Sequence, residues 1–160
     1  MDKRAWVKAL RICDLLWAAA FVGFAAHARE FAQYPAPLGE WRTADGGGVI
    51  AISWCGEYLC GRIVGIKLAP GEPIPKDAAG RSQCGLTIIT NGVPGQDGTW
   101  FGQITDPRDD KQYQVELWVG DGSRLHVRGF IGLPLFGRTE IWERFSGRVT
   151  PNCGIARPDP

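Results

Sequence analysis

The fold of this chain is decided by residues 112–131, which read QYQVELWVGDGSRLHVRGFI. On either side of the central Gly-Asp-Gly-Ser, apolar and polar residues alternate, which is the period of a strand with one buried face. The two halves therefore predict an antiparallel hairpin. Matching their apolar faces requires Val119 opposite Leu125, because a slip of one residue would turn polar side chains into the core. This register also predicts two pairs on the outer face: Glu116 opposite Arg128, and Trp118 opposite His126.

Outward from this hairpin, six further segments have the composition of short strands. β-branched and aromatic residues are frequent in them, and turn-forming residues separate them. The expected strands are 39–43, 49–54, 58–67, 86–90, 99–105 and 138–145, with turn signals at Asn91-Gly92 and Pro94-Gly95. About eight short strands predict an all-β antiparallel sandwich or barrel. We favour a small antiparallel barrel, because closure removes exposed strand edges.

The segments 49–54 and 58–67 predict a second hairpin whose connection is flanked by Cys55 and Cys60. Placed directly opposite each other, the two cysteines would have Cβ atoms about 4.5–5.5 Å apart. That register would pair Trp54 with Gly61, Ile52 with Ile63 and Ile50 with Gly65. The expected core face of this hairpin is Ile50, Ile52, Trp54 and Ile63.

Four cysteines lie outside the N-terminal segment: Cys55, Cys60, Cys84 and Cys153. The short spacing favours a Cys55–Cys60 disulfide, which leaves Cys84 and Cys153 as a second pair or as free thiols. A zinc site is the rival, but Cys-x4-Cys lacks the usual Cys-x2-Cys spacing. A redox role is disfavoured because the chain has no Cys-x-x-Cys motif.

The first 28 residues have the order of a secretory signal peptide. Four Lys and Arg residues precede an apolar run over 15–26, and Ala26-His27-Ala28 is a cleavage site. The run is shorter than the roughly 20 residues of a membrane span, so we expect cleavage, with an uncleaved anchor as the alternative. The expected organisation is a signal peptide over 1–28, a leader over 29–38, a barrel over 39–146 and an irregular tail over 147–160. A periplasmic or secreted location follows, where disulfides are the default.

The expected mature chain, residues 29–160, is close to electrically neutral. Its 14 Lys and Arg and 15 Asp and Glu residues give a formal charge of −1. A nucleic-acid-binding protein would show a basic stripe, so no nucleic-acid partner is expected. The 21 glycines of this segment fit tight turns and bent strands.

Gly39-x-Trp41 in the first expected strand, together with Arg144 in the last, resembles the lipocalin pattern. The resemblance implies that Trp41 closes one end of the barrel and that Arg144 packs across its ring. A cation–π contact of this kind contributes roughly 0.5–2 kcal/mol.

A wider set of segments resembles a family of exported bacterial proteins, domain-of-unknown-function family 2147. The segments are 39–41, 46–52, 55–64, 84–86, 102–107, 111–113, 125–132 and 137–144. Two positions depart from the family pattern: Thr105 stands where it usually has tyrosine, and Asp110 where it usually has glycine. The resemblance covers about residues 39 to 145. It implies an exported, β-rich domain and brings no catalytic residue.

Candidate catalytic or metal-binding residues are few. His126 is the only histidine after residue 28, and the predicted register places it on the outer face beside Trp118. Asp106, Asp109 and Asp110 cluster at one expected turn, where carboxylates can serve acid–base chemistry or bind calcium. Their spacing does not fit an EF-hand loop, and Asp-Pro begins many turns. The sequence therefore predicts no catalytic residue, no metal site and no cofactor for this chain.

Aromatic and cationic residues on the strands are the candidates for ligand binding. Arginine can bind an anionic group with two hydrogen bonds, or it can pair with glutamate across strands. Tryptophan can line a pocket. The predicted ligand-binding residues are Trp54, Trp118, Arg128, Arg138 and Trp142.

These observations favour a non-enzymatic cell-envelope module that binds a small apolar or amphipathic ligand in the mouth of the barrel. It would have a cavity of at least ~300 Å³, and no stable membrane span after cleavage. One alternative is an envelope interaction or structural protein with a filled core and an exposed patch around Trp118, Phe130 and Phe136. Another is a hydrolase of envelope material that acts through Asp106 or His126, one of which would have a shifted pKa.

Overall fold

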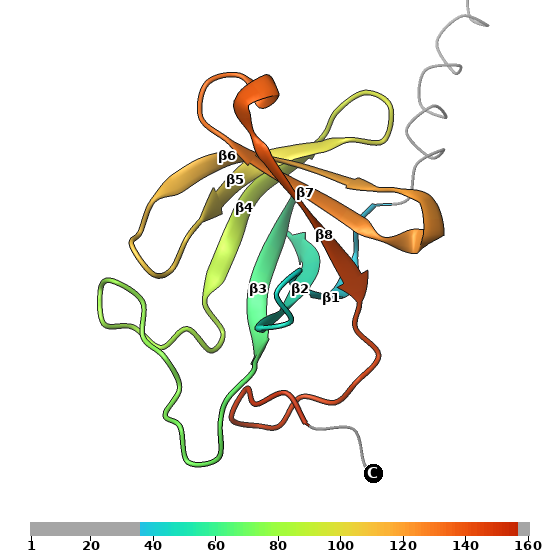
Figure 1. Ribbon diagram of the computed structural model, residues 1–160. Helices are drawn as coiled ribbons and strands as arrows, with labels where there is room; N and C mark the ends of the chain where they lie inside the picture. The colour runs from blue at the N-terminus through green and yellow to red at the C-terminus, as the bar shows by residue number, and fades with distance from the viewer. Residues whose placement is uncertain (1–35, 157–160) are drawn as a thin grey trace, which may run out of the picture. The chain divides into compact units, whose positions relative to one another are not determined.

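The computed structural model describes residues 36–156, and these residues form a closed antiparallel barrel (Figure 1). Eight strands follow one another around it in sequence order, and β1 also pairs with β8. The predicted all-β barrel is confirmed. The strands are β1 Gly39–Arg42, β2 Gly48–Cys55, β3 Tyr58–Ile66, β4 Thr87–Pro94, β5 Trp100–Thr105, β6 Gln112–Val119, β7 Leu125–Phe130 and β8 Arg138–Arg144.

Two 3-10 turns lie in the connections, η2 at Asp121–Ser123 and η3 at Pro134–Phe136. No helix within residues 36–156 is long and apolar enough to cross a membrane. The predicted signal peptide over 1–28 lies outside the described residues, as does the leader up to residue 35.

The β6–β7 hairpin has the register that the alternation predicts. Val119 pairs with Leu125 and Glu116 with Arg128, and Trp118 lies opposite His126. Leu117, Leu125 and Val127 are buried on the inner face. The buried face fixes this register, because any slip by one residue would expose it.

The β2–β3 register differs from the prediction. Cys55 pairs with Tyr58 and Cys60 with Ser53, so the connection is a two-residue turn. Gly56, its first residue, has φ +72°, the conformation that favours glycine at this position of a tight hairpin turn. The observed partners are therefore Trp54 with Leu59, Ile52 with Gly61 and Ile50 with Ile63.

Trp54 is more exposed than the sequence predicts. This residue lies next to the last paired position of β2, and it is 52% exposed. Its predicted place in the core is wrong: it lies opposite the fully buried Leu59, but half of its own side chain is exposed. Its ring makes an edge-to-face contact with Trp100, with the ring centroids 5.6 Å apart.

Strand β4 continues through Asn91-Gly92, the first of two dipeptides that predict turns, and ends at the second. The pairing with β5 shifts between Thr90 and Val93, with one more residue on β4 than on β5. Asn91 has φ +56° at this point. Asparagine tolerates the left-handed region, so Asn91-Gly92 makes a bulge within the strand, and β4 ends only at Pro94.

The core of the barrel consists of the inward-facing apolar side chains of all eight strands. Trp41, Leu59, Ile89, Leu117 and Leu125 are fully buried. Further members are Ile50, Ile52, Ile63, Trp100, Val115, Val127 and Trp142.

Trp41 and Arg144 lie together at one end of this core. The Arg144 guanidinium is 4.0 Å from the centre of the Trp41 ring. Trp41 Nε1 donates a hydrogen bond to the Pro37 carbonyl at 2.8 Å, and Arg144 Nη1 donates one to the Leu38 carbonyl at 2.6 Å. The segment before β1 is thus held across this end, which we call the closed end.

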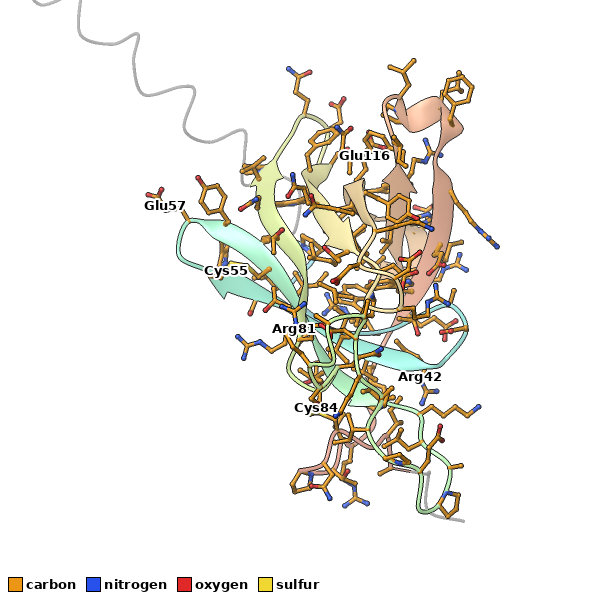
Figure 2. All side chains as sticks on the ribbon, turned by 90° about the vertical axis from the view of Figure 1, so that its left-hand side faces the viewer. Arg42, Cys55, Glu57, Arg81, Cys84 and Glu116 are labelled. Carbon is orange, nitrogen blue, oxygen red and sulfur yellow. A yellow bond between two sulfur atoms is a disulfide. The ribbon has the colours of Figure 1, made fainter. Side chains whose placement is uncertain are left out.

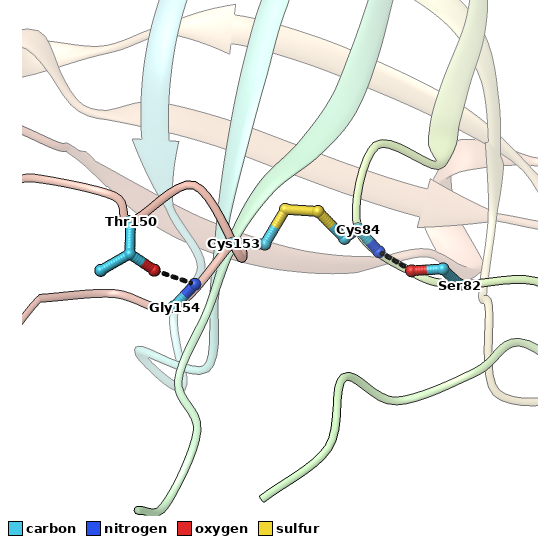
Figure 3. The surroundings of a disulfide bond; sticks show 5 residues. All are labelled: Ser82, Cys84, Thr150, Cys153 and Gly154. Carbon is cyan, nitrogen blue, oxygen red and sulfur yellow. Dashed lines mark hydrogen bonds between the residues drawn. A yellow bond between two sulfur atoms is a disulfide. The ribbon is translucent and has the colours of Figure 1, made fainter. Parts of the chain in front are cut away.

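The C-terminal segment is attached to the end of β3. The Cys153 carbonyl accepts from the Ile66 amide at 2.6 Å, and the Ile66 carbonyl accepts from the Ile155 amide at 3.0 Å. Cys153 also forms a disulfide with Cys84 of the long β3–β4 connection (Figure 3). The sequence did not decide whether Cys84 and Cys153 form a disulfide or remain free thiols, and in the structure they form a disulfide.

Candidate functional site

The end of the barrel opposite Trp41 opens into a cavity of about 620 Å³. Its walls come from the β1–β2, β3–β4 and β5–β6 connections, and from the strand ends next to them. Figure 2 shows the two ends of β2 well apart, with Arg42 near one and Cys55 and Glu57 at the other. The cavity lies at the Arg42 end, because Gly47 and Gly48 line it.

The cavity has an apolar floor and a polar rim. Buried core residues form the floor, and Ile104 and Pro107 extend it. The floor residues of the core are Ile50, Ile63, Ile66, Val127 and Trp142. The polar residues of the wall are Thr43, Asp45, Gln83, Thr105, Asp106, Arg108, Tyr113, Arg138 and Glu140. Such a lining suits a molecule with one apolar and one polar part.

Two carboxylates of the rim are held ionised by local hydrogen bonds. The Arg108 guanidinium donates to both Asp106 oxygens, with the shortest contact at 2.6 Å. This pairing holds the pKa of Asp106 below its usual range. The Thr43 hydroxyl and the Gly47 amide donate to Asp45 Oδ1 and likewise lower the pKa of Asp45. Both groups are negative at neutral pH, and neither is suited to donate a proton as a general acid.

Strand β8 presents three side chains to the cavity at alternate positions: Arg138, Glu140 and Trp142. The Trp142 indole Nε1 donates to Glu140 Oε2 at 3.0 Å. Arg138 lies opposite Gly129 of β7. Because glycine has no side chain, Gly129 does not cover Arg138. Within residues 36–156 the Arg138 guanidinium forms no hydrogen bond or ion pair. A cation without a partner therefore lies on the wall of an amphipathic cavity.

The five predicted ligand-binding residues do not form one site. Arg138 and Trp142 line the cavity. Trp118 and Arg128 lie on the outer face, where Arg128 Nε donates to Thr139 Oγ1 at 2.8 Å and its guanidinium is 5.8 Å from the Trp118 ring centre. Trp54 is at the β2–β3 hairpin, away from the cavity.

The candidate catalytic residues are also separated. Asp106 lines the cavity, whereas His126 stacks on Trp118 on the outer face, with the ring centroids 4.9 Å apart. Phe130 is 6% exposed, so the suggested surface patch of Trp118, Phe130 and Phe136 does not exist in that form. In the part of the chain that the structure describes, no three His, Cys, Asp or Glu side chains are placed to hold a metal ion.

Several lining residues were not among the predicted binding residues. The strand period places Glu140 on the same face as Arg138 and Trp142, so this signal was available in the sequence. Thr43, Asp45 and Arg108 come from connections, where no periodicity indicates which way a side chain points. Thr105, one of the two departures from the family pattern, also lines the cavity.

Comparisons with known proteins agree with this architecture. The model of the family DUF2147, described as an uncharacterized protein conserved in bacteria, matches residues 39–144. No curated protein matches the sequence. Among solved structures, the chain is similar to protein HP1028 from the human pathogen Helicobacter pylori, which is described as belonging to the lipocalin family. The TM-score is 0.60 at 15% identity, over 69% of this chain and 84% of that one. At this identity the likeness concerns the fold alone.

Proposed function

The chain belongs to the bacterial family DUF2147 and has a lipocalin-like barrel, and from this premise we propose that it is a non-enzymatic binding module of the cell envelope. Its ligand is a small amphipathic molecule with an acidic head group. The apolar part of the ligand occupies the barrel, and the head group binds at the rim.

The cavity is the observation that supports ligand binding. Its volume of about 620 Å³ is within the range of roughly 300–1,000 Å³ for small-molecule sites. The floor of isoleucine, valine and tryptophan side chains offers an apolar contact surface. The alternative of a barrel with a filled interior does not account for this space.

Arg138 supports an acidic head group. Arg108 is neutralised by Asp106, whereas Arg138 has no partner within the described residues. A guanidinium beside a partly enclosed cavity binds a carboxylate or phosphate with two charge-assisted hydrogen bonds. Glu140, two residues further along β8, accepts from Trp142 and can also accept from a hydroxyl group of the ligand.

The cell-envelope location rests on two features. The N-terminal 28 residues have the pattern of an export signal. The two disulfides, Cys55–Cys60 and Cys84–Cys153, are suited to an oxidising compartment.

Titration calorimetry with a matched pair of ligands tests the proposed binding. Dodecanoic acid and dodecanol share one apolar chain and differ in the charged head, so we expect the acid to bind more tightly. Arg138→Gln should weaken binding of the acid by about 10- to 100-fold, the value of a charged hydrogen bond, and leave the alcohol unchanged. Arg124→Gln, an exposed arginine at the β6–β7 turn, is the control. Equal affinity of wild type and Arg138→Gln for the acid would contradict the head-group assignment.

A further inference from the structure

The β7–β8 connection is an apolar loop at the rim of the cavity. From Gly129 to Gly137, nine consecutive residues carry no polar side chain. Four large side chains in it are strongly exposed: Ile131 at 74%, Leu133 at 62%, Leu135 at 82% and Phe136 at 79%. We call these four residues the apolar tip. A soluble protein rarely exposes a contiguous apolar group without an interaction partner.

The loop is held in this exposed position by its own contacts. The Phe136 amide donates to the Leu133 carbonyl at 3.1 Å, and the Gly137 amide donates to the Pro134 carbonyl at 2.9 Å. Gly137 packs so closely on β7 that an added Cβ would be 3.0 Å from Phe130 Cβ. Figure 2 shows this connection at the upper right, with side chains pointing away from the strands.

An arginine stands at each end of the apolar segment, Arg128 before it and Arg138 after it. Arg128 donates to the neutral Thr139 hydroxyl, and neither arginine forms an ion pair with a described residue. The rim carboxylate Asp106 and the nearby Asp109 are paired with Arg108 and Lys111. Glu116 lies opposite Arg128 on β6, and Glu140 lies two residues from Arg138 on β8, but neither carboxylate is within ion-pair distance of these guanidinium groups. The base of the loop therefore carries two cations that form no ion pair with a described residue.

We propose that the apolar tip docks the open end of the barrel on a lipid bilayer that contains anionic head groups. Apolar side chains with flanking cations are the combination that binds the interface of such a membrane. A second copy of the chain fits less well, because four such side chains offer on the order of 500 Å², below the roughly 800 Å² per partner of a standard interface.

Docking in this orientation has a consequence for the cavity. Gly129 and Arg138, which bound the loop, both line the cavity. A tip inserted into the interface brings the cavity mouth to the lipid surface, where an amphipathic ligand would enter or leave without crossing water.

Vesicle sedimentation tests this proposal. The protein is purified after export by its host, and intact-mass spectrometry identifies the N-terminus of each preparation. We expect binding to vesicles of phosphatidylglycerol and phosphatidylcholine that falls with added salt, and weak binding to pure phosphatidylcholine. The double variant Leu135→Ser/Phe136→Ser should reduce binding at least tenfold. The matched control, Trp54→Ser/Tyr58→Ser, removes two exposed aromatic side chains at the β2–β3 hairpin and should bind like wild type.

Two results would overturn the proposal. Unchanged vesicle binding of Leu135→Ser/Phe136→Ser would show that the tip does not contact the bilayer. Sedimentation velocity that finds a wild-type dimer, dispersed by the same double variant, would assign the tip to a second copy instead. Dodecanoic acid binding in vesicle-free solution should be the same for this variant and wild type, which separates the docking proposal from the proposed function.

Discussion

Gly39 lies at the closed end of the barrel, beside Arg144. It has φ +111°, a backbone conformation that L-amino acids rarely adopt. An added Cβ would also overlap Arg144 Nη1, the group that lies over Trp41 and binds the Leu38 carbonyl. The arginine therefore reaches across the barrel end only because position 39 carries no side chain.

We expect Gly39→Ala to lower the free energy of unfolding by about 1–3 kcal/mol, the usual cost of a strained backbone conformation. Urea denaturation followed by tryptophan fluorescence measures this change. Gly129→Ala is the control, because its added Cβ would meet only Tyr113 Cβ, at 4.0 Å, and its cost should be below that of Gly39→Ala. Equal stability of the two variants would contradict the role given to Gly39.

Single residues also show where sequence patterns mislead. Alternation places Trp54 on the same face as Ile52, but it does not show that a residue so near the end of β2 is half exposed. Asp110 has φ +57°, a left-handed conformation that favours glycine, the residue expected here from the family resemblance.

Among the elements, the hairpins differ in how well the sequence specifies them. The β6–β7 register followed from two long alternating segments with matching apolar faces. The β2–β3 register did not, because Gly61 and Gly65 leave gaps in the apolar pattern of β3, and the cysteines form their disulfide as diagonal neighbours with Cα atoms 5.9 Å apart. Asn91-Gly92 has the composition of a turn, and only the pairing of β4 with β5 shows that it is a bulge.

The two disulfides should stabilise their elements unequally. Cys84–Cys153 joins residues 69 apart and ties the β3–β4 connection to the C-terminal segment, whereas Cys55–Cys60 joins residues 5 apart within a hairpin. A disulfide lowers the entropy of the unfolded chain, and this effect grows with the number of residues in the loop that the disulfide closes. The resulting stabilisation is roughly 4 kcal/mol for Cys84–Cys153 and about 2 kcal/mol for Cys55–Cys60.

Paired Cys→Ala variants of each disulfide, compared by chemical denaturation, test this order. The Cys84→Ala/Cys153→Ala variant should have the lower unfolding midpoint. If removal of Cys55–Cys60 destabilised the protein more, the C-terminal segment would not anchor the barrel in the way its contacts with Ile66 indicate.

At the scale of the whole molecule, closure creates the candidate site. The strand count and the need to cover edges were enough to predict a barrel, because both follow from local composition. The cavity was not predictable in detail, because it depends on which connections surround one end of the barrel and on the pairing of Arg138 of β8 with Gly129 of the neighbouring strand β7. Five aromatic and cationic residues are predicted to bind ligand, but the alternation of side chains along each strand places Trp118 and Arg128 on the outer face and Arg138 and Trp142 on the cavity wall.

The claim that the barrel interior is a binding site is tested most directly by filling it. Gly129 lines the cavity, has no strained φ, and has room for a Cβ, so Gly129→Leu should place a side chain inside the cavity while the barrel remains folded. Gln114→Leu adds the same side chain on the exposed outer face of β6 and is the control.

Titration calorimetry with dodecanoic acid on both variants is the deciding measurement, with circular dichroism used to verify the fold. Ligand binding should be lost in Gly129→Leu and retained in Gln114→Leu. Wild-type affinity in a folded Gly129→Leu protein would contradict a ligand site inside the barrel.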